Sequence, residues 1–154
     1  MKKVLFISST GGHLNELLQL ESTMKKYDSY LITEKTKSTI DLKKKFSKVG
    51  YFKYGSKSHL SYIYIFPWNC IKGLFYFLKI RPDVVVTTGA HTGVIMCYIA
   101  KLFRKKIIFI ETFANMSSKT VSGKLVYPIA DLFVVQWESM LNIYPYAVYG
   151  GWIF

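Results

Sequence analysis

The sequence predicts an α/β fold built on a doubly wound parallel sheet. The chain has 154 residues, 51% hydrophobic and 17% aromatic, which is enough apolar material for one packed core and too little for two full domains. Short apolar runs alternate with amphipathic stretches at the spacing of βαβ units. The clearest run, 83–88, is apolar on both faces, which is typical of a central parallel strand. We therefore expect one domain over residues 1–154.

The first half of the chain begins with a buried strand. The apolar run 4–8 predicts that strand, and apolar residues from Leu14 to Met24 at helical spacing predict the helix after it. A second strand is expected at 29–33, a solvated lysine-rich helix at 35–48 and a third strand at 49–54. The opening apolar run is too short for a signal peptide, so we expect none.

The second half continues the same alternation of strands and helices. Strands are expected at 83–88, 106–111 and 131–136, and helices at 92–103 and 123–129. The stretch from Leu60 to Leu78 has three interpretations: a membrane span, a crossover helix packed in the core, or a helix lying partly in the membrane interface. Pro67, Asn69 and Lys72 near its centre disfavour the span, and its aromatic residues favour the interface.

The charge balance suggests an anionic partner. Lys and Arg number 21 against 9 Asp and Glu, a net charge of +12 that suits a nucleic acid, a phosphorylated substrate or an acidic lipid surface. The alternative is a set of solvated faces that keep an apolar protein soluble. The scarcity of arginine and the lack of a recognised module disfavour nucleic acid. Cys70 and Cys97 form no pattern for zinc or a disulfide framework, and we expect neither a metal nor a cofactor.

Three polar loops follow strands of the predicted sheet and should meet at its carboxyl edge, where ligands bind in this fold class. They contain Gly11, Gly12 and His13; Gly89 and His91; and Glu111 with Thr112. The glycines let backbone N–H groups approach an anion, although the first loop matches neither a Walker A nor a dinucleotide fingerprint.

Individual side chains in these loops allow a functional and a structural interpretation. His13 is either a general base or a residue that satisfies the start of a helix, His91 has the same alternatives, and His59 is expected at the surface. Glu111 ends an apolar strand, where a carboxylate has two interpretations. It either serves function, as a substrate ligand or a charge that orients His13, or it is a structural partner of the loop that follows. Glu16 is expected to act on the helix dipole or as a cap.

Seven motifs, in order along nearly the whole chain, carry a resemblance to a known family. They are GGHLNEL at 11–17, PDVVVTTGA at 82–90, IETF at 110–113, SGKLVY at 122–127, ADLFVVQW at 130–137, YP at 144–145 and YGG at 149–151. The chain resembles the oligosaccharide-biosynthesis family that contains the membrane-recruiting subunit of the dolichol-linked N-acetylglucosaminyltransferase. Bacterial members of that family serve as partner subunits of capsule and exopolysaccharide glycosyltransferases.

The resemblance implies the Rossmann-like, acceptor-side N-terminal half of a split GT-B glycosyltransferase, with a separate subunit binding the UDP-sugar. It implies inverting transfer without an essential metal, to a lipid-diphosphate-linked saccharide at the cytoplasmic membrane face. His13 would be the base, and Glu111 a second catalytic candidate. The acceptor and diphosphate contacts would be Gly11, Gly12, Asn15, Gly89, His91 and Thr112. The partner interface would be Tyr149, Gly150, Gly151, Trp152, Ile153 and Phe154. The eukaryotic subunit begins with a membrane anchor, whereas this sequence opens at the first strand, so membrane attachment is expected from 60–78, the lysines or the partner.

Two other functions remain open from the sequence. The chain is either a scaffold that anchors and activates its partner without a proton-transfer residue, or a free-standing flavodoxin-like nucleotide-binding protein. The subunit interpretation predicts little activity without a second protein, whereas the flavodoxin-like one predicts nucleotide binding by the isolated chain.

Overall fold

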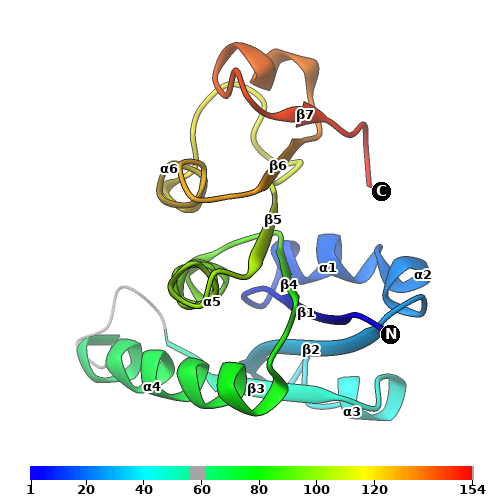
Figure 1. Ribbon diagram of the computed structural model, residues 1–154, viewed down its shortest axis with the longest axis vertical. Helices are drawn as coiled ribbons and strands as arrows, with labels where there is room; N and C mark the ends of the chain where they lie inside the picture. Colours follow the sequence, from blue (N-terminus) through cyan, green and yellow to red (C-terminus); the bar gives the residue numbers. More distant parts are fainter. Residues whose placement is uncertain (56–61, 154) are drawn as a thin grey trace.

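A computed structural model describes residues 1–55 and 62–153 and contains one seven-stranded sheet with every strand parallel (Figure 1). The strands are β1 (Lys3–Ile7), β2 (Asp28–Lys35), β3 (Val49–Lys53), β4 (Val84–Thr87), β5 (Lys106–Ile110), β6 (Leu132–Val135) and β7 (Val148–Tyr149). Their order across the sheet is β3-β2-β1-β4-β5-β6-β7. The predicted α/β, doubly wound class is confirmed. Strand order reverses between β1 and β4, which marks the expected binding crevice.

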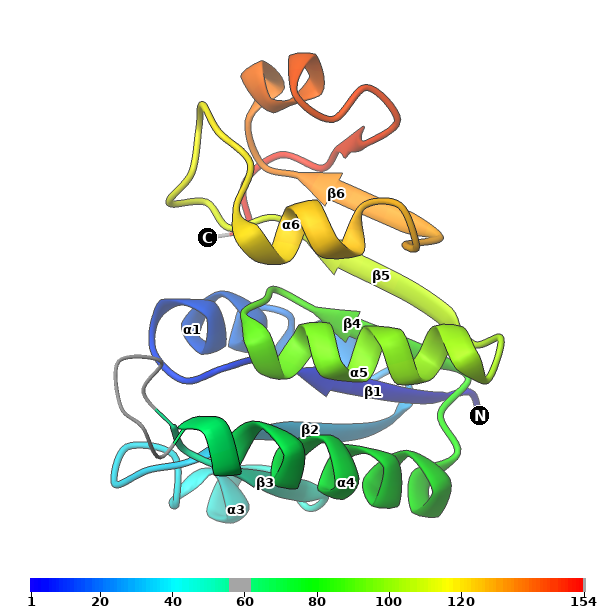
Figure 2. The same cartoon turned by 90° about the vertical axis from the view of Figure 1, so that its left-hand side faces the viewer.

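Helices cover both faces of this sheet. They are α1 (Gly12–Leu18), α2 (Glu21–Met24), α3 (Leu42–Lys45), α4 (Tyr62–Ile80), α5 (His91–Leu102), α6 (Val121–Val126) and the 3₁₀ helix η1 (Glu138–Asn142). Helices α4, α5 and α6 lie side by side on one face, while α1, α2 and α3 lie on the other (Figures 1 and 2). Each face has its own apolar cluster, because successive strand residues point to opposite sides.

An aromatic layer packs under α5 and α6. Phe109 and Phe133 stack with ring centroids 4.9 Å apart, and Tyr144 packs 4.5 Å from Phe133. All three side chains are buried. This aromatic layer holds β5 and β6 against the segment that follows η1, and it thereby fixes the end of β5 relative to that segment.

The lysine-rich stretch 35–48 differs from its prediction as a helix. Only Leu42–Lys45 is helical. Before it, Thr39 Oγ1 donates to the Glu34 carbonyl at 2.6 Å and accepts from Thr36 N at 2.9 Å. Threonine side chains that bond the backbone in this way compete with helix formation, so a turn replaces the first half of the predicted helix.

Other boundaries were also wrong in detail. The helix expected from Leu14 to Met24 is interrupted after Leu18, so that α1 and α2 are separate. The sequence did not predict β7 or η1. Strand β7 has only two residues, both exposed, and gives no apolar signal, because an edge strand this short is defined by its pairing with β6.

Helix α4 occupies residues 62–78 of the stretch that had three interpretations, and one of its faces packs in the core; residues 60 and 61 lie outside the described residues. Asn69 is buried and bonds the backbone of Lys53, accepting from N at 3.0 Å and donating to O at 2.9 Å. Tyr76 Oη accepts from Tyr51 N at 3.1 Å. These bonds attach α4 along β3, as a crossover helix requires. Among residues 1–55 and 62–153, no helix combines the length and apolarity needed to cross a membrane.

Candidate functional site

The three predicted loops meet at the carboxyl edge of the sheet, as their position after β1, β4 and β5 requires. Ser9 N donates to Gly89 O at 3.2 Å, and the Ser9 and Thr92 hydroxyl oxygens lie 2.8 Å apart. The loop after β5 joins them through Thr112, which bonds a residue of α1. The site is therefore a continuous edge built from residues up to a hundred positions apart in the sequence.

His13 is held firmly at the centre of this edge. Its carbonyl accepts a 2.6 Å hydrogen bond from Thr88 Oγ1. Its ring lies against Gly89, whose φ of +101° is in the region that favours glycine; a Cβ on Gly89 would lie 3.4 Å from both Nδ1 and Cε1 of the ring. His13 Nδ1 is buried and makes no hydrogen bond within the part of the chain that is described. Buried polar atoms are rarely left unpaired, so this nitrogen is a candidate for contact with a ligand.

Glu111 is buried at the end of β5 and is held by neighbours on its own side of the site. Its carboxylate accepts hydrogen bonds from Tyr144 Oη at 2.9 Å, Thr120 Oγ1 at 3.0 Å and Thr112 N at 3.1 Å. A Cβ on Gly123 would lie 2.3 Å from both Glu111 Oε2 and Tyr144 Oη, so only glycine permits this approach of α6. Burial raises the pKa of Glu111, while the three hydrogen bonds and the charge of a protonated His13 act in the opposite direction.

The raised pKa predicts a measurable effect of Glu111→Gln on stability. The folded chain keeps the Glu111 proton to higher pH than the unfolded chain, so this group makes the free energy of unfolding fall as pH rises above the ordinary pKa of 4.5. Glutamine does not titrate. We expect the variant to gain stability relative to wild type as pH rises above the ordinary pKa of 4.5, measured by urea unfolding.

Asp131→Asn is the matched control for this prediction. Lys106 lowers the pKa of Asp131, so that carboxylate contributes stability that is lost as pH falls. Relative to wild type, the control should therefore lose stability as pH rises, whereas Glu111→Gln should gain it. A difference between Glu111→Gln and wild type that does not change with pH would contradict the assignment of a raised pKa.

Glu16 corrects a prediction. It was expected to serve the helix dipole or a cap, but it lies in the middle of the site and is buried. Its carboxylate accepts from Thr112 Oγ1 at 2.6 Å, Phe113 N at 3.3 Å and Gln136 Nε2 at 3.3 Å. One side chain of α1 therefore joins the ends of β5 and β6.

Glu34 and Gln136 are polar site residues that sequence reasoning missed. Glu34 is buried at the end of β2, accepts from Thr10 N at 3.0 Å, and lies 3.2 Å from His91 Nε2. Glu34 thus holds the first loop and His91 together. Both residues end apolar strands, the same signal that identified Glu111.

The other predicted contacts lie at different depths. Gly89 and Thr112 are buried, whereas Gly11, Gly12 and Asn15 are exposed. Gly11 has φ +86° and open space around it, which lets the loop turn sharply into α1. His59 lies outside the described residues. Within them, no group of three His, Cys, Asp or Glu side chains is arranged to hold a metal ion.

The predicted partner-interface segment returns to the same edge. Tyr149 of β7 pairs with Val135 of β6. Ile153 N donates to Gln136 Oε1 at 3.1 Å. The exposed Trp152 ring contacts Phe113 and Trp137, with centroids 5.4 and 5.2 Å away. Gly150 and Gly151 connect these contacts, and Phe154 lies outside the described residues. The tail therefore borders the site and presents aromatic surface beside it.

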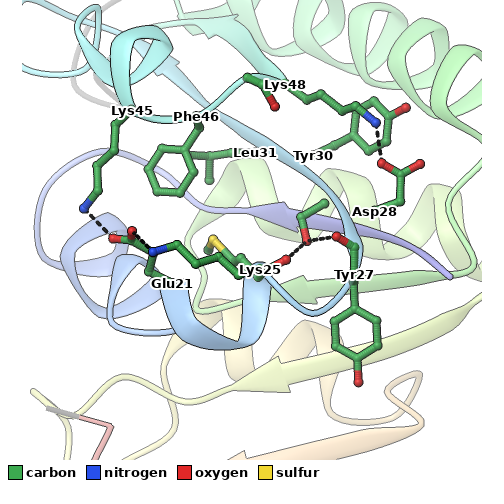
Figure 3. Close-up of a pocket in the computed structure, with 12 residues that line it drawn as sticks. Glu21, Lys25, Tyr27, Asp28, Tyr30, Leu31, Lys45, Phe46 and Lys48 are labelled. Carbon is green, nitrogen blue, oxygen red and sulfur yellow. Dashed lines mark hydrogen bonds and ion pairs between the residues drawn. The ribbon is translucent and has the colours of Figure 1, made fainter. Parts of the chain in front are cut away.

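A hollow of about 300 Å³ lies elsewhere, between α2, the start of β2 and α3 (Figure 3). Its charged side chains pair with one another: Glu21 with Lys25 and Lys45, and Asp28 with Lys48. These charges are already satisfied, and the hollow is at the amino end of β2, away from the converging loops. We assign it no role.

The chain is similar to a known family and to named relatives along nearly its whole length. The family model described as "Oligosaccharide biosynthesis protein Alg14 like" matches residues 4–153. The UDP-N-acetylglucosamine transferase subunit alg14 of Schizosaccharomyces pombe is 30% identical over 176 residues, covering 97% of this chain and 82% of that protein. The ALG14 subunit of Mus musculus is 28% identical over 177 residues, with the same coverage.

Solved structures give the same fold. The crystal structure of Acinetobacter baumannii MurG has a TM-score of 0.72 and 13% identity, covering 90% of this chain and 43% of that one. The UDP-N-acetylglucosamine 2-epimerase of Rickettsia bellii has a TM-score of 0.70 and 20% identity, covering 92% and 40%. The chain thus spans less than half the length of these two proteins.

Proposed function

The chain belongs to the family of Alg14-like oligosaccharide biosynthesis proteins, and from this membership we propose that it is the acceptor-binding, membrane-recruiting subunit of a two-component inverting glycosyltransferase. A separate catalytic subunit would bind the UDP-sugar, and the acceptor would be a lipid-diphosphate-linked saccharide. The observation that carries the proposal is the match along 97% of the chain to proteins named as transferase subunits. Residues 1–154 would then form the acceptor-side half of the enzyme.

His13 is the proposed base. The acceptor hydroxyl attacks the anomeric carbon of the donor, its proton passes to the imidazole, and the bond from that carbon to the nucleotide diphosphate breaks on the opposite face. The unpaired Nδ1 supports this role, because a base needs a nitrogen free to take the proton. Stabilisation of the departing diphosphate would come mainly from the partner half.

Glu111 and Glu16 have a proposed supporting role. Glu111 contributes negative charge near His13 that favours the imidazolium formed in transfer, and Glu16 keeps the loop after β5 in place. Gly11, Gly12, Asn15, Gly89, His91 and Thr112 remain the proposed acceptor and diphosphate contacts. The excess of lysine suits the anionic diphosphate and its membrane.

The partner subunit is proposed to dock along β7 and the tail from Tyr149 to Phe154. An incompletely covered sheet face next to that tail supports this placement. On the α1 side of β5 and β6, Ile108 and Val134 are partly exposed and Leu132 is 37% exposed, while the alternate residues facing α5 and α6 are buried. A hollow of about 320 Å³ continues from this face to α2. Apolar sheet faces of this kind are normally covered.

The polysaccharide context is a proposal that rests on the bacterial members of the family. We propose capsule or exopolysaccharide assembly at the cytoplasmic face of the cell membrane. The relatives reported above are named as subunits of a UDP-N-acetylglucosamine transferase, so UDP-N-acetylglucosamine is the first donor to test.

Co-expression with a candidate partner tests the proposed function. We expect a glycosyltransferase subunit encoded beside this gene to co-purify with the chain, and the complex to transfer sugar from a UDP-sugar to membrane lipid extract. The chain alone should show less than about a hundredth of that transfer. Full transfer by the isolated chain, or nucleotide binding without a partner, would contradict a subunit role.

A further inference from the structure

Helix α4 carries an exposed apolar stripe along its outer side. Tyr64, Trp68, Ile71, Phe75 and Leu78 follow one another at intervals of four and three residues, which places them on one face of the helix. Tyr64 is 80% exposed, Ile71 67% and Phe75 60%. The opposite face of α4 packs on β3 and the core, so folding of the chain does not bury this stripe.

The apolar surface extends onto the two neighbouring helices. Figure 2 shows α4, α5 and α6 side by side toward the viewer. Exposed apolar side chains on α5, its C-cap and α6 add to the stripe: Tyr98, Leu102, Phe103, Val121 and Leu125. Exposed apolar side chains gathered on neighbouring helices in this number indicate an interaction site.

The charges on the same three helices have one sign. Helices α4, α5 and α6 contain Lys72, Lys79, Lys101 and Lys124 and no acidic residue. None of these lysines forms an ion pair within the described residues. By contrast, Glu21 of α2 on the other face pairs with Lys25 and Lys45. The apolar surface is therefore bordered by unpaired positive charge.

We propose that the α4–α5–α6 face is a membrane-binding surface that lies on an anionic bilayer, with α4 in the plane of the interface. Lysines attract acidic headgroups, apolar side chains enter the boundary below them, and Tyr64 and Trp68 suit the headgroup level. A protein partner would need acidic groups to match these lysines, whereas an anionic bilayer supplies both negative charge and an apolar layer over the whole face.

This surface explains how the site reaches its acceptor, and in that respect it rests on the proposed function. Because α4 follows β3 and runs back along the sheet, its first turns lie toward the carboxyl edge of the strands (Figure 2). Those turns contain Tyr64 and Trp68. Binding through this face therefore brings that edge close to the headgroups of the bilayer.

Vesicle co-sedimentation of the full chain tests the surface. Wild type should bind vesicles of phosphatidylcholine mixed with phosphatidylglycerol more tightly than vesicles of phosphatidylcholine alone. The double variant Trp68→Gln/Phe75→Gln should bind the mixed vesicles at least about tenfold more weakly than wild type. Lys72→Gln and Lys79→Gln should each weaken binding about fivefold, an effect that added salt removes.

Tyr27→Gln/Ile40→Gln is the matched control, because both residues are exposed apolar side chains outside the α4–α5–α6 face. It should bind like wild type, and circular dichroism and thermal unfolding should show that all variants fold. Equal vesicle binding by the stripe variant and the control, or no binding by wild type, would overturn the proposal. So would a stripe variant that keeps vesicle binding and loses only the co-purifying subunit. The vesicle measurement itself contains neither partner nor donor, so a failure to bind vesicles is distinct from a failure of sugar transfer.

Discussion

Replacement of His13 by alanine should lower transfer by the reconstituted complex about 10²–10⁴-fold, the usual contribution of a positioned general base. The ring contributes a buried nitrogen that nothing in the described chain uses, and its backbone is held independently by Thr88. The loop should therefore keep its shape when the ring is removed. Initial rates of sugar transfer to lipid acceptor, measured with saturating partner, check the expectation.

His13→Gln separates catalysis from structure. It keeps a polar side chain of similar size without a basic nitrogen, so it should lose transfer as His13→Ala does and also lose the limb of the pH–rate profile that reports the base. Partner co-purification and vesicle binding should be unchanged in both variants. Wild-type turnover in either one would instead support the scaffold interpretation, in which the chain only anchors and activates its partner.

Glu16→Ala should destabilise the chain by about 2–4 kcal/mol, because removal of the buried carboxylate takes an acceptor from three buried or half-buried donors. Those donors are Thr112 Oγ1, Phe113 N and Gln136 Nε2. They lie at the ends of β5 and β6, so the loss should also loosen the loop that contains Thr112. Urea unfolding measures the stability change, and hydrogen exchange of the loop amides measures the local one.

Glu21→Ala is the matched control on the neighbouring helix α2. Its carboxylate pairs with Lys25 and Lys45 at the surface, and such pairs contribute little to stability. Glu16→Gln, which keeps an acceptor oxygen, should recover part of the loss. A Glu16→Ala variant as stable as Glu21→Ala would contradict the structural role assigned to Glu16.

Strands and their connecting loops were the most predictable part of the molecule. The β-branched run at β4 is buried on both faces after its first residue, so local composition alone distinguishes it from helix. Parallel strands place their carboxyl ends at one edge, which is why His13, Gly89 and Glu111 could be grouped before the structure was known. The turn at 36–40 was missed because side-chain hydrogen bonds of Thr39 outweigh the helical pattern.

Partners of the polar residues were much less predictable. Glu16 was interpreted from its own helix, whereas its three hydrogen bonds come from Thr112, Phe113 and Gln136, about a hundred or more positions away. Glu34 received no role, although it holds Thr10 and His91. Hydrogen bonds of this kind depend on a few tenths of an ångström and on the order of strands, and neither appears in local sequence pattern.

The amino-acid sequence by itself determined that the chain forms a parallel α/β sheet with a polar, partly glycine-rich edge, because hydrophobic periodicity and β-branched runs act over a few residues. The tertiary structure alone decided which nitrogen of that edge is left unpaired, which carboxylates serve as supports, and which side of α4 faces outward. The physical reason is that burial and pairing are properties of neighbours in space. The sheet order places β1 between β2 and β4, and that order determines which side chains become neighbours.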